Sequence, residues 1–147
     1  MLRYCIKSFD DLTTKELYAI LQLRIEIFVV EQNCPFQDLD GQDFEALHIF
    51  SINTSRCMAY ARLSQTDARE ALISRVMISQ ENRGKGLAYE LMTLSVEQAK
   101  KRFPQNQIKI AAQKHLQPFY KKCGFEYNGH DFYEDGILHC TMYYISQ

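Results

Sequence analysis

The sequence lacks the features that mark several large classes of protein. Its 147 residues carry a formal net charge of -1, whereas binding to the phosphate backbone of nucleic acid needs clustered Lys and Arg. No apolar run nears the roughly 20 residues that cross a bilayer, and the first residues lack the long apolar segment of a secretory signal. The sequence therefore predicts a cytoplasmic protein with no nucleic-acid partner and no membrane partner.

Its cysteine and histidine patterns argue against a disulfide framework and against a metal site. The five cysteines are odd in number and form no C-x-x-C pair, which fits reduced, mostly buried thiols. The four histidines lack the spacing of metal ligands, so no metal is expected. Cys34 lies in a predicted loop without an assigned base, and an incidental thiol is the favoured interpretation.

The chain shows no internal repeat, low-complexity tract or linker, so one domain over residues 1–147 is the simplest interpretation. Alternating and branched residues predict strands at 2–9, 47–52, 57–64, 70–79, 108–112, 125–133 and 137–145. Helical spacing predicts helices at 15–32, from the turn at 83–86 to 103, and at 113–123. This order of elements predicts a mixed α/β sheet with helices on both faces.

The predicted helix 15–32 and the loop after it carry charges that need an explanation. Arg24 and Glu31 fall on the apolar stripe of the helix, and charged side chains are seldom buried without a partner. For Glu31 we expect either a salt bridge, to Arg24 or Arg62, or a catalytic role. The loop is acidic, which suits a solvated turn or the attraction of a cationic amine; its carboxylates are Asp38, Asp40 and Asp43.

The segment between the strand 70–79 and the next helix reads Arg83-Gly84-Lys85-Gly86-Leu87-Ala88. A helix N-terminus offers unpaired N–H groups and a partial positive charge, and glycines let the backbone approach an anion closely. Together these properties predict a pyrophosphate site, with a ligand-free tight turn as the alternative. The segment is not a P-loop, because Lys85 is followed by Gly and Leu, and it lacks the last Gly of a Rossmann fingerprint.

A second motif follows downstream, where residues 119–125 read Phe-Tyr-Lys-Lys-Cys-Gly-Phe. The two motifs, in this order along the chain, resemble those of the GCN5-related N-acetyltransferase (GNAT) superfamily. Arg83, Gly86 and Ala88 match its phosphate loop, R/Q-x-x-G-x-G/A, and residues 119–125 match its F-Y-x-x-x-G-F element. Several stretches are similar to the ElaA-like branch of the superfamily, whose acceptors are poorly defined; they include residues 24–32, 38–43 and 112–120. The resemblance implies an α/β (α+β) fold with a twisted mixed sheet of six to seven strands, flanked by helices and splayed between strands 4 and 5.

The resemblance also implies how acetyl-CoA (coenzyme A) binds as co-substrate. It would lie between the strands at 70–79 and 108–112, with its pantetheine arm along the backbone and its pyrophosphate on the N–H groups of residues 83–88. The implied cofactor-binding residues are Met77, Ile78, Arg83, Gly84, Lys85, Gly86, Leu87, Ala88, Gln113, His115, Phe119 and Tyr120. The implied partner is a small-molecule or peptide amine, and a homodimer is left open.

In the implied reaction, a neutral amine attacks the thioester directly within a ternary complex. The backbone N–H of Ile78, or of Met77, is the expected oxyanion donor, and Tyr120 protonates the leaving thiolate as general acid. The candidates for the base are Glu31, Glu134, His139 and His48.

A hydrogen-bonded structural role is favoured for two of these candidates, His48 and His139. The residues expected at the acceptor site are Arg24, Glu31, Asp38, Asp40, His48 and His139. Two other functions stay open. One is a non-catalytic acyl-CoA sensor or partner-binding module on the same fold, and the other is a different nucleotide-binding α/β protein.

Overall fold

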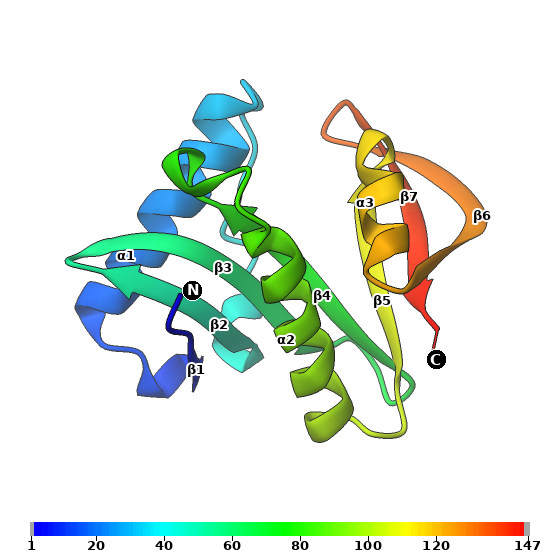
Figure 1. Ribbon diagram of the computed structural model, residues 1–147, viewed down its shortest axis with the longest axis horizontal. Coiled ribbons are helices and arrows are strands. Elements are labelled where there is room, and N and C mark those ends of the chain that lie inside the picture. Colours follow the sequence, from blue (N-terminus) through cyan, green and yellow to red (C-terminus); the bar gives the residue numbers. More distant parts are fainter. Residues whose placement is uncertain (1, 146–147) are drawn as a thin grey trace.

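Seven strands form one continuous sheet, in the order β1-β2-β3-β4-β5-β7-β6. The computed structural model describes residues 2–145. Every neighbouring pair of strands is antiparallel except β4 and β5, which run parallel. The predicted mixed sheet is confirmed (Figure 1). Its strands are β1 (Cys5–Ser8), β2 (Leu47–Asn53), β3 (Arg56–Gln65), β4 (Glu70–Ile78), β5 (Gln107–Gln113), β6 (Phe125–Glu134) and β7 (Ile137–Tyr144).

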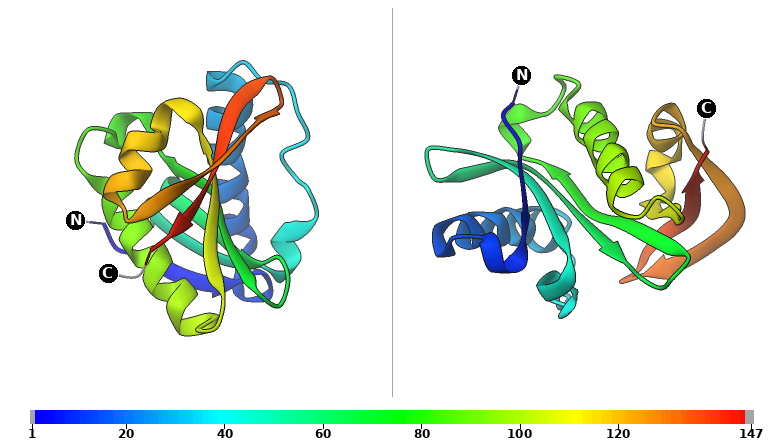
Figure 2. Two further views of the ribbon diagram at one scale, coloured as in Figure 1. Left: turned by 90° about the vertical axis from the view of Figure 1, so that its right-hand side faces the viewer. Right: turned by 90° about the horizontal axis from the view of Figure 1, so that it is seen from below.

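Helices cover both faces of this sheet, as the two views of Figure 2 show. α1 (Thr14–Arg24) packs on one face, in an apolar cluster with Phe50, Tyr60 and Met77. α2 (Leu87–Arg102) and α3 (Gln117–Lys122) contribute to the larger core on the other face. The described part of the chain also contains four 3-10 turns: η1 (Phe9–Asp11), η3 (Gln42–Glu45), η4 (Gln80–Asn82) and η5 (Lys114–Leu116). Over residues 2–145, no helix is both long and apolar enough to span a membrane.

The predicted helix 15–32 divides into two parts. The α-helical part ends at Arg24, and a π-helical segment, η2 (Ile25–Glu31), follows it. The backbone hydrogen bond from the N–H of Gln32 to the carbonyl of Ile27, five residues back, shows the wider π-helical turn. The prediction of one regular helix is therefore wrong over residues 25–31, because apolar spacing alone does not distinguish a π-turn from an α-turn.

β4 and β5 are paired only near their first residues. Glu70 lies beside Gln107, Ala71 beside Ile108 and Leu72 beside Lys109, and within residues 2–145 no later pair joins the two strands. β4 nevertheless continues to Ile78 and β5 to Gln113, so their carboxyl-terminal halves diverge (Figure 1). The predicted splay between strands 4 and 5 is confirmed, and it opens the sheet beside the glycine loop.

Candidate active site

The loop between β4 and α2 leaves a row of backbone N–H groups without an acceptor. Gly84 and Gly86 have φ angles of 78° and 77°, which glycine adopts at little cost. Gly86 caps α2 without a side-chain hydrogen bond, so the first N–H groups of the helix, from Leu87 on, stay free. Among the described residues, no acceptor pairs with the N–H groups of residues 84–86 either. Such a row, at a positive helix end, suits an anion.

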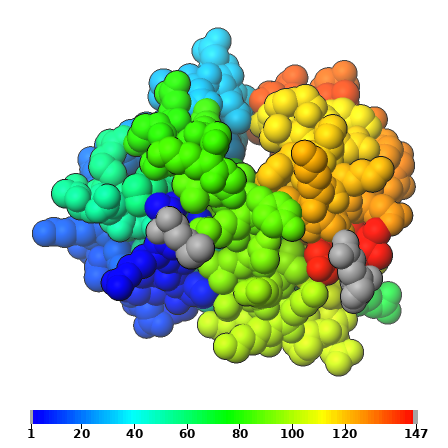
Figure 3. Space-filling view, in the orientation of Figure 1, coloured from blue at the N-terminus to red at the C-terminus, as the bar shows by residue number. Residues whose placement is uncertain are grey.

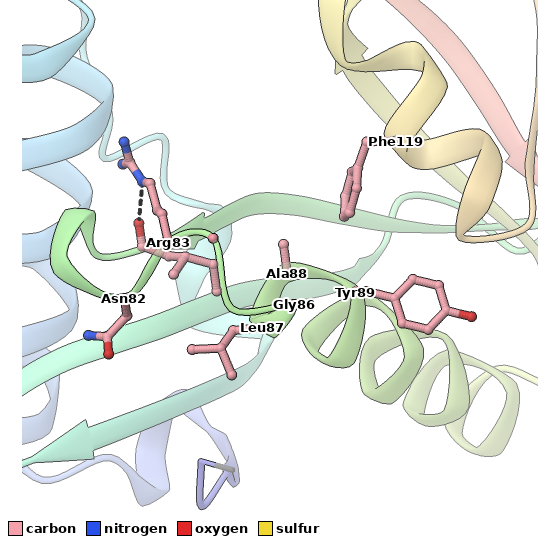
Figure 4. Close-up of a pocket in the computed structure, with 9 residues that line it drawn as sticks. Asn82, Arg83, Gly86, Leu87, Ala88, Tyr89 and Phe119 are labelled. Carbon is pink, nitrogen blue, oxygen red and sulfur yellow. Dashed lines mark hydrogen bonds between the residues drawn. The ribbon is translucent and has the colours of Figure 1, made fainter.

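This loop lines a pocket of about 260 Å³, and Phe119 of α3 stands opposite it (Figure 4). A Cβ added at Gly84 or at Gly86 would meet no atom within 4 Å, so there is free space directly above the backbone. In the space-filling view a hollow separates the loop from α3 (Figure 3). The lining residues are Ile78, Asn82, Arg83, Gly84, Gly86, Leu87, Ala88, Tyr89 and Phe119.

The Arg83 side chain lies beside this pocket and ties three elements together. Its Nε donates to the carbonyl of Ile78 at 3.1 Å, and its two terminal nitrogens donate to the carboxylate of Glu31 at 2.8 and 3.0 Å. The ion pair expected for Glu31 is therefore present, but its partner is Arg83, and the expectation of Arg24 or Arg62 is wrong. Both of those arginines pair instead with aspartates of the segment 38–43, which follows η2.

A bulge deforms β4 between its paired part and the pocket. Tyr60 lies opposite Met77 and Arg62 lies opposite Ser74, so two residues of β4 face a single residue of β3. One of the two is Arg75, whose φ of 55° is left-handed. A non-glycine residue in this conformation costs on the order of 1–3 kcal/mol, so contacts around Arg75 must hold it there.

Tyr120 lies in α3, buried against the core and beside the pocket-lining Phe119, with ring centroids 5.0 Å apart. Burial, together with the nearby Cys123 thiol, raises the pKa of Tyr120 to about 12, so its hydroxyl stays protonated at neutral pH. The hydrogen bonds of tyrosine hydroxyls within residues 2–145 are made by Tyr60, Tyr127, Tyr143 and Tyr144, and not by Tyr120. A protonated phenol without a hydrogen-bond acceptor is available as a donor.

The remaining residues expected at the cofactor site are divided between two places. Gln113 is the last residue of β5 and pairs with His139 of β7, so it lies at the rim of the opening. Exposed His115 instead lines a separate cavity of about 530 Å³. That cavity is formed with Lys114, Gln117, Pro118 and Lys121.

On the face of the sheet that α1 covers, three arginines and three aspartates form a closed ring of ion pairs. Going around it, each arginine bridges two carboxylates and each aspartate accepts from two arginines, at 2.6 to 3.4 Å. The order is Arg24, Asp43, Arg62, Asp40, Arg75, Asp38 and back to Arg24. We call these six residues the charge ring. Arg24, Arg62 and Asp38 are at most 2% exposed, so the ring explains how these charges can be buried.

Two carboxylates of the charge ring, Asp40 and Asp43, have lowered pKa values. For Asp43, burial alone would raise the pKa, but hydrogen bonds and charge from Arg24 and then Arg62 outweigh it, and the pKa is lowered. Arg75 is further flanked by the rings of Phe28 and Phe36, with its guanidinium carbon 6.0 and 5.8 Å from their centroids. The ring thus joins the last residue of α1, the loop before β2, β3 and the bulge of β4.

His48 is buried, and both of its ring nitrogens are hydrogen-bonded. Nδ1 lies 2.7 Å from the hydroxyl of Tyr60, and Nε2 lies 2.9 Å from the carbonyl of Asp43. Because a carbonyl can only accept, Nε2 carries the proton and Nδ1 accepts from the tyrosine. Burial lowers the pKa of His48. These contacts agree with the favoured interpretation of a structural histidine, one that fixes the peptide of Asp43.

The sequence analysis did not predict the role of Arg75 or the closed ring of ion pairs. The available signal was Arg24 on an apolar stripe, which indicated a buried partner without identifying it. In residues 2–145, His, Cys, Asp and Glu side chains form no group of three placed to hold a metal ion.

Known proteins resemble the chain over nearly its whole length. A family model for the acetyltransferase (GNAT) domain matches residues 28–146. Protein ElaA of Escherichia coli (strain K12) is 40% identical over 137 residues, which is 90% of this chain and 90% of ElaA. The crystal structure of an acyl-CoA N-acyltransferase from Pseudomonas aeruginosa is 37% identical, with a TM-score of 0.92 over 99% of this chain and 100% of that one. A Bacillus subtilis acetyltransferase, solved in complex with CoA, shares the fold at 19% identity, with a TM-score of 0.67 over 100% of both chains.

Proposed function

The chain belongs to the GNAT acetyltransferase family, and we propose that it transfers an acetyl group from acetyl-CoA directly to the amine of a small-molecule or peptide acceptor. The observation that carries this proposal is the opening between β4 and β5, which ends at a row of free N–H groups above open space. Coenzyme A is an extended molecule with a pyrophosphate, and this arrangement fits both properties. The N–H groups of residues 84–89 would hold the pyrophosphate.

The strand geometry favours Ile78 over Met77 as the oxyanion donor. The N–H of Ser79 donates to the carbonyl of Met58 on β3 at 2.8 Å, and successive residues of a strand direct their N–H groups to opposite edges. The N–H of Ile78 is therefore directed toward the opening and that of Met77 toward β3. One such donor is worth about 3–4 kcal/mol in a transition state.

Tyr120 would act as the general acid. The protonated state of its phenol, and its place beside Phe119 at the pocket, support this role. When the tetrahedral adduct collapses, the carbon–sulfur bond breaks and the sulfur takes the phenolic proton. Proton transfer of this kind contributes about 10²- to 10⁴-fold to a rate.

The charge ring would serve the acceptor side indirectly. The carboxylates of Asp38 and Asp40 are each engaged by two arginines, so we propose that they hold the 33–44 loop and Arg75 in place rather than attract a cationic amine themselves. We propose the same positioning role for Arg24, which is a member of the charge ring.

The test is release of CoA from acetyl-CoA by the purified protein, measured over a broad panel of primary amines. Amine-dependent thiol release above the rate without enzyme is expected. The variant Tyr120→Phe should lose about 10²-fold or more in kcat and keep acetyl-CoA binding, measured as stabilisation against heat. Tyr143→Phe is the matched control, because the Tyr143 hydroxyl bonds Glu70 at the paired end of β4 and β5.

Each outcome selects one function. Stabilisation by acetyl-CoA without turnover of any amine would favour a non-catalytic acyl-CoA sensor. Stabilisation by ATP or NAD but not by CoA would instead indicate a different nucleotide ligand. Normal turnover in Tyr120→Phe would remove that residue from the mechanism while leaving the acetyltransferase function in place.

A further inference from the structure

His139 lies on the sheet face opposite to Tyr120. Its neighbours Cys140 and Met142 on β7 belong to the same core cluster as Tyr120. Because successive side chains of a strand alternate between faces, His139 and Thr141 lie on the other face, which they share with Gln113 and Ala111 of β5. An acid and a base placed on opposite faces of an open seam can reach the same reacting group from two sides.

The tautomer of His139 is set by the backbone. Its Nδ1 lies 2.8 Å from the carbonyl of Ile137, and a carbonyl accepts but does not donate, so Nδ1 carries the proton in the neutral ring. Nε2 then has a free lone pair. The carboxylate of Glu134 lies 3.7 Å from Nε2; the Glu134 side chain is 58% exposed and that of His139 is 10% exposed. This edge of the ring is therefore mostly covered and lies beside a negative charge.

An aromatic stack holds the ring in place. Phe132 lies between His139 and His130, with centroid distances of 5.7 and 5.5 Å and interplanar angles of 22° in both pairs. Such stacking restricts rotation of the His139 ring, and the bond to Ile137 fixes its direction. A base must be held in a productive orientation to be effective, and His139 meets that condition.

His139 also lies at the rim of the opening between β4 and β5. It pairs with Gln113, the last residue of β5, where that strand has left β4. The turn of the β6–β7 hairpin reaches across to the other half of the molecule, because the thiol of Cys34 donates to the carbonyl of Asp135 at 3.4 Å. Figure 1 shows this turn facing the end of η2 across the opening. The hairpin that carries His139 is thus one wall of the acceptor side.

Two of the other candidate bases, Glu31 and His48, are already engaged, and the third, Glu134, lies beside His139 itself. Both oxygens of Glu31 accept from Arg83, and both ring nitrogens of His48 are used in the buried interior. We propose that Nε2 of His139 is the general base that takes a proton from the acceptor amine, assisted by the nearby carboxylate of Glu134. This inference rests on the proposed acetyltransferase function and goes beyond it.

The proton balance is complete with these two groups. An alkylammonium with a pKa of about 10.4 must first lose a proton to become a nucleophile, and Nε2 of His139 takes it and releases it to solvent. The amine nitrogen then bonds to the acetyl carbon, and the carbon–sulfur bond breaks as Tyr120 protonates the sulfur. The second proton from nitrogen restores the phenol through solvent. The sum is one amide, one thiol and one proton released.

The test compares two classes of nucleophile in the variant His139→Gln. Primary alkylamines are protonated at pH 7, whereas alkoxyamines of similar size are already neutral. We expect CoA release from acetyl-CoA to fall about 10²-fold or more with the alkylamines and only a few-fold with the alkoxyamines. The ratio of the two rates is independent of how much of the variant is folded. In His139→Ala, added imidazole should restore part of the alkylamine rate.

His130→Gln is the matched control, because His130 stacks on the other side of Phe132 and bonds Thr141. It should keep the wild-type ratio. Equal losses with both classes of nucleophile in His139→Gln, with no rescue by imidazole, would overturn the assignment of the base. If the wild-type protein releases no CoA with any amine, the proposed function itself fails, and the base assignment falls with it.

Discussion

Asp38 Oδ1 accepts a hydrogen bond from Nε of Arg75 at 2.9 Å, and this contact joins the loop before β2 to a left-handed residue of β4. The strain at Arg75 is on the order of 1–3 kcal/mol, and the charge ring offsets it. The bulge lies between the paired end of β4 and Ile78. The Asp38–Arg75 pair therefore helps to hold the part of β4 that borders the opening.

Replacing Asp38 with Asn should lower the free energy of unfolding by about 3–5 kcal/mol. The substitution leaves Arg24, which is 1% exposed, without one of its two counter-charges, and breaking a buried pair has this cost. Urea unfolding measures the loss. The control is Glu26→Gln, which breaks the exposed pair with Arg56 and should cost less than about 1 kcal/mol. Similar losses in the two variants would contradict a stabilising role for the ring.

Stability should decrease as the pH falls from about 4 toward 2. Burial on its own would raise the pKa of Asp40, but hydrogen bonds from Arg62 and from the N–H of Gln42 lower it to about 2. The unfolded value is about 3.9. Between these values the unfolded chain binds more protons than the folded one, so acid favours unfolding.

Urea midpoints at several pH values between about 2 and 5 measure this dependence. The variant Asp40→Asn lacks the ionisable group and should show a shallower slope, even if it is less stable throughout. A slope equal to that of the wild type would mean that Asp40 does not contribute to the acid sensitivity.

Alanine substitutions at two glycines distinguish the cost of backbone strain from the cost of steric overlap. Gly124 has a φ of 98°, and a Cβ there would lie 2.8 Å from Cε1 of Tyr144; Gly129 has a φ of 88° with no atom within 4 Å. Gly129→Ala should cost about 1 kcal/mol from the left-handed conformation alone. Gly124→Ala should cost more by about 1–3 kcal/mol, because the ring must move. Thermal unfolding compares them, and equal costs would show that Tyr144 gives way freely.

Glu31→Gln should leave most of the turnover intact. The Glu31–Arg83 pair is about 40% exposed on each side, so its loss should change stability by less than about 1 kcal/mol. Because Arg83 also donates to the carbonyl of Ile78, we expect a modest rise in the KM for acetyl-CoA. A fall in kcat of about 10²-fold with KM unchanged would instead identify Glu31 as the base.

Much of the fold followed from local patterns in the sequence. Branched runs located all seven strands, and the glycines at 84 and 86 located the loop at the start of α2. The resemblance to a known family supplied the splay between β4 and β5, which no local pattern contains. The π-helical turn at 25–31 was missed, because apolar spacing is nearly the same for both kinds of helix.

The sequence by itself determined which groups are present: a glycine loop at a helix N-terminus, a tyrosine in the F-Y-x-x-x-G-F element, and charges on an apolar stripe. Only the tertiary structure decided which of them meet. Arg83 rather than Arg24 pairs with Glu31, three arginines and three aspartates close into a ring, and His139 faces away from Tyr120. The physical reason is that ion pairing and the face of a sheet depend on which strands are neighbours and in which register, and those contacts join residues far apart in the chain.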